Sequence, residues 1–243
     1  VPLGTYIGQH MGWRASFGAI ALMGVIALIG IAILIPRLKQ EKSTSIKQQI
    51  AALISPKLLV FLLICALGNS GLFAVFTYIT PLLVDITGFA EYSVTWILVL
   101  FGIGVTVGNI VGGKLADWKL MPSILGIYVV IVIALTALTF TIHNEIAAVA
   151  TIFVWGAGSF AVMPGLQVRI MGIAKGAPAL ASTSSHSAGN LGNAVGAFVG
   201  GWGITHMSLS SLPWVGAILV GLALAVGAGS VLSERGAAVR SGK

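Results

Sequence analysis

The sequence predicts an all-α polytopic membrane protein, and composition is the first observation behind that prediction. Of the 243 residues, 57% are hydrophobic and only 8% are charged, and the mean hydropathy is +1.04. Soluble domains carry roughly 25% charged residues, with which they cover their water-facing surface. This chain has too few polar groups to do so, and lipid must therefore be the solvent for most of it. The lengths of its apolar segments and the placement of its basic residues support the same fold class.

Apolar segments of about 20 residues recur along the chain, and this is the length that an α-helix needs to cross a membrane. Seven such segments predict seven spans, at 16–36, 58–84, 94–113, 122–142, 146–168, 180–204 and 212–232. One extended polar stretch, at 37–57, is amphipathic and separates the first span from the other six. The predicted domains are an N-terminal part at 1–36 (a helix stub and one helix), a cytoplasmic central loop at 37–57, a six-helix half at 58–232 and a cytoplasmic tail at 233–243.

Lys and Arg occur in every second connection, and this alternation predicts the orientation in the membrane. The connections at 85–93, 143–145 and 205–211 contain neither residue, and Arg14 is the one exception to the pattern. Because cytoplasmic loops retain Lys and Arg, we expect a multi-pass protein of a bacterial inner membrane with a cytoplasmic C-terminus. The net charge of +7 is explained by these loops, and no nucleic-acid partner is expected. The basic connections contain Arg37, Lys39, Lys42, Lys47 and Lys57, then Lys114 and Lys119, then Arg169 and Lys175, then Arg235, Arg240 and Lys243.

Enzymatic and cofactor-dependent functions find no support in the sequence. Cys65 is the single cysteine and lies within an apolar segment, so it predicts neither a disulfide nor a metal site. The chain contains no Gly-rich phosphate loop of the kind that binds ATP. We therefore expect a protein that is not an enzyme and that holds no metal and no cofactor. The four histidines are scattered over separate segments, as His10, His143, His186 and His206.

Two local motifs resemble those of the major facilitator superfamily. The segment 108–117 reads GNIVGGKLAD and is similar to the family's cytoplasmic loop motif, whose core here is Gly113, Lys114, Leu115, Ala116 and Asp117. The segment 1–9 resembles the tail of the antiporter motif at the end of helix five, with Pro2, Gly4 and Gly8 as its remnant. Together they resemble the drug and sugar efflux branch, the arabinose-efflux-like permeases and the drug–proton antiporter-1 group. The resemblance implies the C-terminal part of a major facilitator fold, from late helix five through helix twelve. Val1 is not a start residue, and we expect the N-terminal helices to be missing.

The family resemblance implies a transporter that exports a small molecule by alternating access, coupled to proton antiport in the complete protein. The proton-binding acid would then lie in the missing N-terminal helices, which are expected partners of this chain along with the lipid bilayer and the substrate. In the loop motif, Asp117 would latch the cytoplasmic gate, or else be a solvated loop charge. Pro2, Gly4 and Gly8 would form a leak-preventing kink, or an ordinary helix end. The alternative function is a non-transporting membrane module, either a truncated product or a sensor or partner-binding subunit.

The predicted span 180–204 is the most polar of the seven. At 100° per residue, His186, Asn190 and Asn193 share one face of a helix. Polar groups at membrane depth are costly unless they face protein or a wet cavity, so this face either lines the substrate path or forms hydrogen bonds across a helix interface. His186 is expected to be structural or to line the mouth of the path. A neighbouring stripe of glycines, Gly189, Gly192, Gly196 and Gly200, predicts close packing on a partner helix.

A second candidate lining lies on the predicted span 58–84. Asn69, Phe73, Phe76 and Thr80 fall on one helical face. The aromatic stripe either packs on a neighbouring helix or lines a site, in which case an amide, two rings and a hydroxyl suit a moderately apolar ligand. Trp155 and Ser159 share a face on the span 146–168, where packing and ligand contact remain equally open. No Asp, Glu, Lys or Arg lies near the centre of any predicted span. The amides suit a sugar or nucleoside and the rings suit an amphiphilic drug, so the substrate class stays open.

Overall fold

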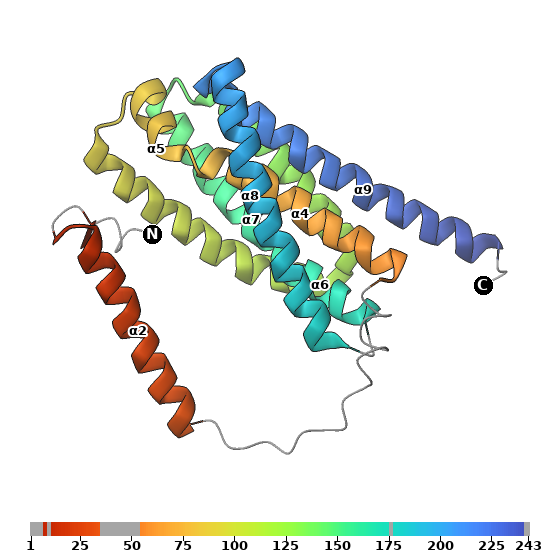
Figure 1. Ribbon diagram of the computed structural model, residues 1–243. Coiled ribbons are helices and arrows are strands. Elements are labelled where there is room, and N and C mark those ends of the chain that lie inside the picture. The colour runs from red at the N-terminus through yellow and green to blue at the C-terminus, as the bar shows by residue number, and fades with distance from the viewer. Residues whose placement is uncertain (1–6, 9–10, 35–53, 175–176, 241–243) are drawn as a thin grey trace.

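The computed structural model describes residues 7–8, 11–34, 54–174 and 177–240, and every element in this part of the chain is helical (Figure 1). The all-α prediction is therefore confirmed. The predicted central loop lies mostly outside the described residues. The elements are α2 (Trp13–Leu34), α4 (Pro56–Phe76), α5 (Ile79–Pro81), the π-helix η1 (Leu82–Thr87), α6 (Glu91–Thr141), α7 (Glu145–Ile173), α8 (Pro178–His206), the 3-10 helix η2 (Leu209–Ser211) and α9 (Leu212–Arg240).

The 51-residue helix α6 consists of two arms joined by a sharp kink. Lys119 sits at the kink, with a non-helical backbone at φ −148° and ψ 91°. Pro122 follows within the next turn and lacks the amide that a continuous helix would need. The hydroxyl of Ser123 donates to the carbonyl of Leu115 at 2.7 Å, which bridges the two arms. The arms correspond to the predicted spans 94–113 and 122–142.

The predicted span 58–84 is not one continuous helix. Helix α4 ends at Phe76, and the chain turns at Thr77 and Tyr78 before α5 begins. Pro81 explains the break, because it has no N–H to donate to the carbonyl of Thr77 and its ring would crowd that carbonyl. The π-helix that follows ends at Gly88, whose φ of 91° is accessible to glycine.

Glycines set the closest contacts between the helices of the bundle. A Cβ atom at Gly192 or Gly196 would overlap the backbone carbonyls of Ala66 and Ser70 on α4. The prediction that the α8 glycine stripe packs on a partner helix is thus confirmed. Gly108 and Gly112 in the first arm of α6 meet the backbone of α7 in the same way. The α4–α8 and α6–α7 pairs are consequently the closest-packed of the structure.

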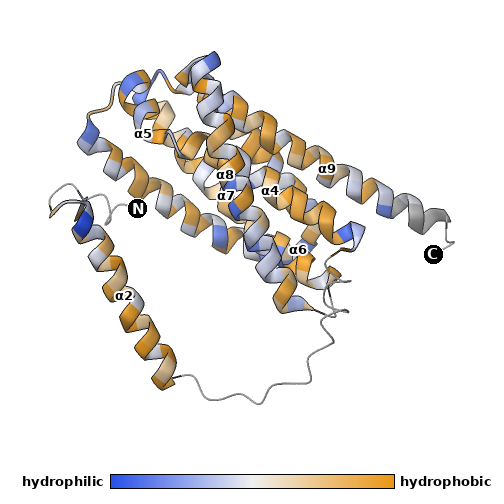
Figure 2. Ribbon diagram, in the orientation of Figure 1, coloured by the Kyte–Doolittle hydropathy of each residue, from blue (hydrophilic) through white to orange (hydrophobic). Residues whose placement is uncertain are grey.

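Among the described residues, five helices are long and apolar enough to cross a membrane: α2, α4, α6, α7 and the stretch 209–234. Figure 2 shows mostly hydrophobic residues on these helices, with more hydrophilic ones on α8 and at the helix ends. Counting the two arms of α6 separately accounts for six of the seven predicted spans. Helix α8 has 29 residues, enough for the seventh, but its serines, asparagines and glycines lower its hydropathy. Such a helix needs protein or water, rather than lipid alone, against its polar face.

The outer parts of the chain differ in two ways from the six-helix bundle. Helix α2 stands apart from the other helices in Figure 1, and none of its residues is buried. It is apolar on all sides, as expected of a helix that lies in lipid or against further helices. At the other end of the chain, α9 continues to Arg240, so the helix extends into the predicted tail 233–243.

Candidate functional site

A polar cavity of about 530 Å³ opens between α4, α6, α7 and α8. It brings together four of the residues singled out from the sequence, on two helices far apart in the chain. No Asp, Glu, Lys or Arg is among the residues that line it. The cavity therefore offers amide and imidazole groups in a setting without formal carboxylate or ammonium charge. Its polar lining is Asn69 from α4, Asn109 from α6, Gln167 from α7, and His186, Asn190, Asn193 and Ser185 from α8.

The hydrogen bonds already made in this cavity show which groups are left for a ligand. Gln167 is committed to α8, because its amide nitrogen donates to Ser182 and its carbonyl oxygen lies 3.0 Å from the Ser185 hydroxyl. Asn69 lines the cavity and donates to the carbonyl of Cys65 at 2.9 Å, which leaves its side-chain oxygen and its second N–H for other partners. The oxygen Oδ1 of Asn193 is buried and has no partner in the described part of the chain. A buried acceptor without a partner is costly, and a donor from a ligand or water would relieve that cost.

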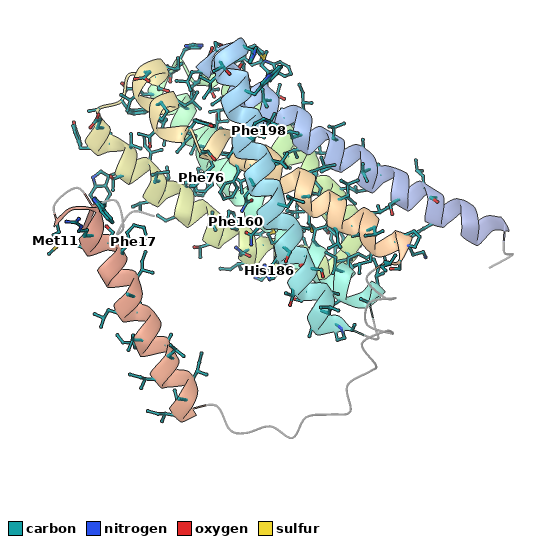
Figure 3. All side chains as sticks on the ribbon, viewed as in Figure 1. Met11, Phe17, Phe76, Phe160, His186 and Phe198 are labelled. Carbon is teal, nitrogen blue, oxygen red and sulfur yellow. The ribbon has the colours of Figure 1, made fainter. Side chains whose placement is uncertain are left out.

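An apolar cavity of about 260 Å³ lies beside the polar one. Phe73 and Phe76 from α4 and Phe101 from α6 line it. The ring centroids of Phe73 and Phe76 lie 5.9 Å apart, and those of Phe76 and Phe101 lie 5.1 Å apart. Phe160 of α7 lines both cavities. Figure 3 shows Phe76, Phe160 and His186 following one another between α8 and the first arm of α6. Together the two cavities contain six of the nine predicted lining residues.

Three of the predicted lining residues lie elsewhere. Thr80 is exposed and lies on α5, beyond the break at Thr77, so the prediction that it continues the face of Asn69 is wrong. Trp155 is 0% exposed, and its ring packs 5.2 Å from that of Phe101. Trp155 is therefore a core residue, in agreement with the first of its two interpretations, helix packing. Ser159 is also buried and lines a small cleft behind Asn69.

The loop motif occupies the end of the first arm of α6. Lys114 and Asp117 are both exposed there, and neither forms an ion pair with any residue that the structure describes. The ion pair at the helix ends is instead formed by Arg169 and Glu234, a pair that sequence reasoning missed. Of the antiporter-motif remnant, Pro2 and Gly4 lie outside the described residues. Gly8 is helical, and its carbonyl accepts a hydrogen bond from the amide of Gly12 at 3.1 Å. The core positions Gly113, Leu115 and Ala116 lie in the same helix, and the Leu115 carbonyl accepts the Ser123 bond across the kink.

A larger groove of about 640 Å³ lies between the two arms of α6 and α7. Its lining is apolar except for Ser123 and Lys119, and the Ser123 hydroxyl is already bonded to Leu115. The groove thus has few directional groups with which to orient a polar solute. An outward-facing apolar groove of this kind suits lipid chains, and we place the candidate substrate site in the polar cavity.

A bundle of membrane-crossing helices that carries a polar cavity fits one half of a secondary transporter, because the substrate sites of such transporters lie where two repeats meet. A family model described as Major Facilitator Superfamily matches residues 1–185. The chain belongs to this family, which confirms the resemblance drawn from the loop and antiporter motifs.

Curated relatives agree with this assignment. The chain is 40% identical over 225 residues to the Inner membrane transport protein YdhP of Escherichia coli K12, covering 92% of this chain and 58% of that protein. It is 32% identical to the Putative transporter AraJ of the same organism, covering 84% and 52% respectively. It is also 32% identical to the Chloramphenicol resistance protein of Streptomyces lividans, covering 93% and 59%. The chain therefore spans less than three fifths of the length of each of these relatives.

Proposed function

We propose that this chain forms the C-terminal part of an exporter that carries a small uncharged molecule out of a bacterial cell by alternating access. The observation that carries the proposal is the polar cavity, in which Asn69 of α4 and Asn190 and Asn193 of α8 meet. Hydrogen-bonding groups at membrane depth are expected where they line a substrate path. The relatives named for inner-membrane transport and for chloramphenicol resistance support export in particular.

The proposal includes proton antiport in the complete protein. Proton coupling needs a group that changes charge within the membrane, usually a carboxylate, and no Asp, Glu, Lys or Arg lines the polar cavity in the described structure. We therefore assign the coupling group to helices that precede those of this chain. The C-terminus is proposed to be cytoplasmic, because Lys57 and Arg169 of the basic clusters contact Glu234, near the end of α9. Asp117 is proposed to act at the cytoplasmic gate when the two halves meet.

The test uses the complete protein in inside-out membrane vesicles, with a pH gradient as the driving force. Radiolabelled chloramphenicol, a pentose and a nucleoside serve as neutral probes. Asn190→Ala and Asn193→Ala should abolish uptake of the transported probe without lowering membrane abundance, because each removes a group that holds the solute. Ser187→Ala is the matched control, since its hydroxyl is exposed and bonded to Thr183 on its own helix.

If both asparagine variants exported the probe at the wild-type rate, the polar cavity would not be the substrate site. The complete wild-type protein could also fail to move any probe, and fail to dissipate the pH gradient when a probe is present. That result would favour the alternative of a non-transporting membrane module.

A further inference from the structure

Phe160 lies where the polar and the aromatic cavities meet, since it lines both. We infer that the two cavities are two compartments of one binding site, and that the substrate is an uncharged amphipathic molecule. Its hydroxyl or amide end occupies the polar compartment and an aromatic ring occupies the aromatic compartment. Phe160 is the shared wall that selects for this combination. The inference rests on the proposed function, because it names the class of substrate that the exporter carries.

The polar compartment offers hydrogen-bond acceptors and donors to a solute. The oxygen Oδ1 of Asn193 is buried without a partner, and the amide nitrogens of Asn69 and Asn109 each donate to a carbonyl of their own helix, at 2.9 and 3.2 Å. Each of these two amides keeps its side-chain oxygen and a second N–H. Hydroxyl and amide groups of a solute satisfy such acceptors and donors, whereas an apolar end would leave them unpaired.

The aromatic compartment selects a ring. Phe73, Phe76, Phe101 and Phe160 line it, and its volume is about 260 Å³. A dry engineered cavity of about 150 Å³ is known to hold benzene, so there is room for one aromatic group. Ring pairs stabilise one another beyond the effect of buried area. A solute without a ring would leave this compartment unfilled.

The absence of charged side chains in the linings of both compartments sets the charge of the substrate. An ion that moved from water into such a lining would find no side chain of opposite charge, and the transfer is therefore strongly unfavourable. Among the described residues that line the two cavities, His186 is the one titratable side chain at the open polar end, and Cys65 lies buried on the wall. A neutral solute is therefore favoured over an ionic drug.

A matched pair of probes tests the inference directly in the purified complete protein. Arabinose and 4-nitrophenyl arabinoside carry the same hydroxyl groups and differ in the aromatic ring. We expect the aryl arabinoside to bind about tenfold or more tightly than the free sugar, by equilibrium dialysis. Phe160→Leu keeps an apolar side chain but removes the ring, and it should weaken aryl arabinoside binding about 3–10-fold. Phe140→Leu is the control, because Phe140 is 70% exposed and lines neither compartment.

Each result bears on the inference. The inference is supported if the aryl arabinoside binds more tightly than arabinose, and if this difference is lost in Phe160→Leu but kept in Phe140→Leu. Equal binding of the two probes, including no binding of either, would overturn it, as would an unchanged affinity in Phe160→Leu. Proton-driven export of free arabinose that stops in Asn190→Ala, with no gain from the aryl group, would leave the proposed function standing while overturning the two-compartment site.

Discussion

One nitrogen of Arg169, Nη2, donates to both carboxylate oxygens of Glu234, at 2.6 and 2.7 Å. This pair ties the end of α7 to α9. The guanidinium also lies over the ring of Phe61 on α4, with 5.2 Å to the ring centroid. The Arg169 side chain is 25% exposed, so the pair is partly shielded from water and holds three helix ends together. Lys57 approaches the same carboxylate, at 3.8 Å, from a more exposed position.

Breaking this pair should destabilise the bundle. Arg169→Gln and Glu234→Gln are each expected to lower the free energy of unfolding by about 1–2 kcal/mol, because a partly buried charge loses its partner. Lys57→Gln should have a much smaller effect, since that side chain is 70% exposed. Thermal unfolding of the purified protein in detergent measures all three. Equal melting temperatures for Arg169→Gln and the wild type would show that the pair contributes nothing to stability.

The α4–α8 contact should not tolerate a larger residue at its glycines. Gly192→Val or Gly196→Val is expected to cost at least about 1–3 kcal/mol and to lower membrane abundance, because the side chain would collide with backbone atoms of α4 that cannot move aside. Gly221→Val serves as the control, since nothing lies within 4 Å of the position of its Cβ. Quantitative immunoblots of membranes give the readout. Normal abundance of Gly196→Val would mean that the helices are less closely packed than described.

A single interhelical hydrogen bond can be tested without changing shape. The hydroxyl of Tyr78 donates to the carbonyl of Ala197 on α8 at 2.9 Å, and Tyr78→Phe should lower the free energy of unfolding by about 0.5–1.5 kcal/mol. Tyr92 is 76% exposed and makes no such bond among the described residues, so Tyr92→Phe should leave the melting temperature unchanged. If the two variants melted alike, the Tyr78 bond would not be a stabilising contact.

Much of the fold follows from the sequence because the bilayer imposes simple rules. Segment length and the lack of charge predict the helices, and glycine spacing predicts the face of α8 that packs on α4. Helix breaks follow from more local chemistry. The periodicity that groups Thr80 with Asn69 assumes an unbroken helix, and Pro81 removes that condition by withdrawing a hydrogen bond from Thr77.

The sequence predicts only part of the lining of the polar cavity. The polar face of α8 stands out because several polar residues recur at helical spacing, and the structure places Asn69 beside it. Asn109 lies on α6, whereas Phe160 and Gln167 lie on α7, and nothing in the sequence indicates that the three converge. The amide of Asn109 does carry a signal, since a polar group well inside a predicted span demands the same explanation as Asn190. The partnership of Arg169 with Glu234 joins residues 65 positions apart, which periodicity does not reveal.

Accessibility of Asn190 to water shows whether the polar face of α8 lines the substrate path. In the complete protein, Cys65→Ser removes the chain's one cysteine, and Asn190→Cys then places a thiol on that face. Thiols react as thiolates and need water to ionise, so a polar, membrane-impermeant thiosulfonate should label Asn190→Cys and a transported solute should slow the labelling. Ile133→Cys, on an exposed apolar face of α6, should stay unlabelled because it faces lipid. An Asn190→Cys protein that resists the reagent in both right-side-out and inside-out vesicles would contradict the account.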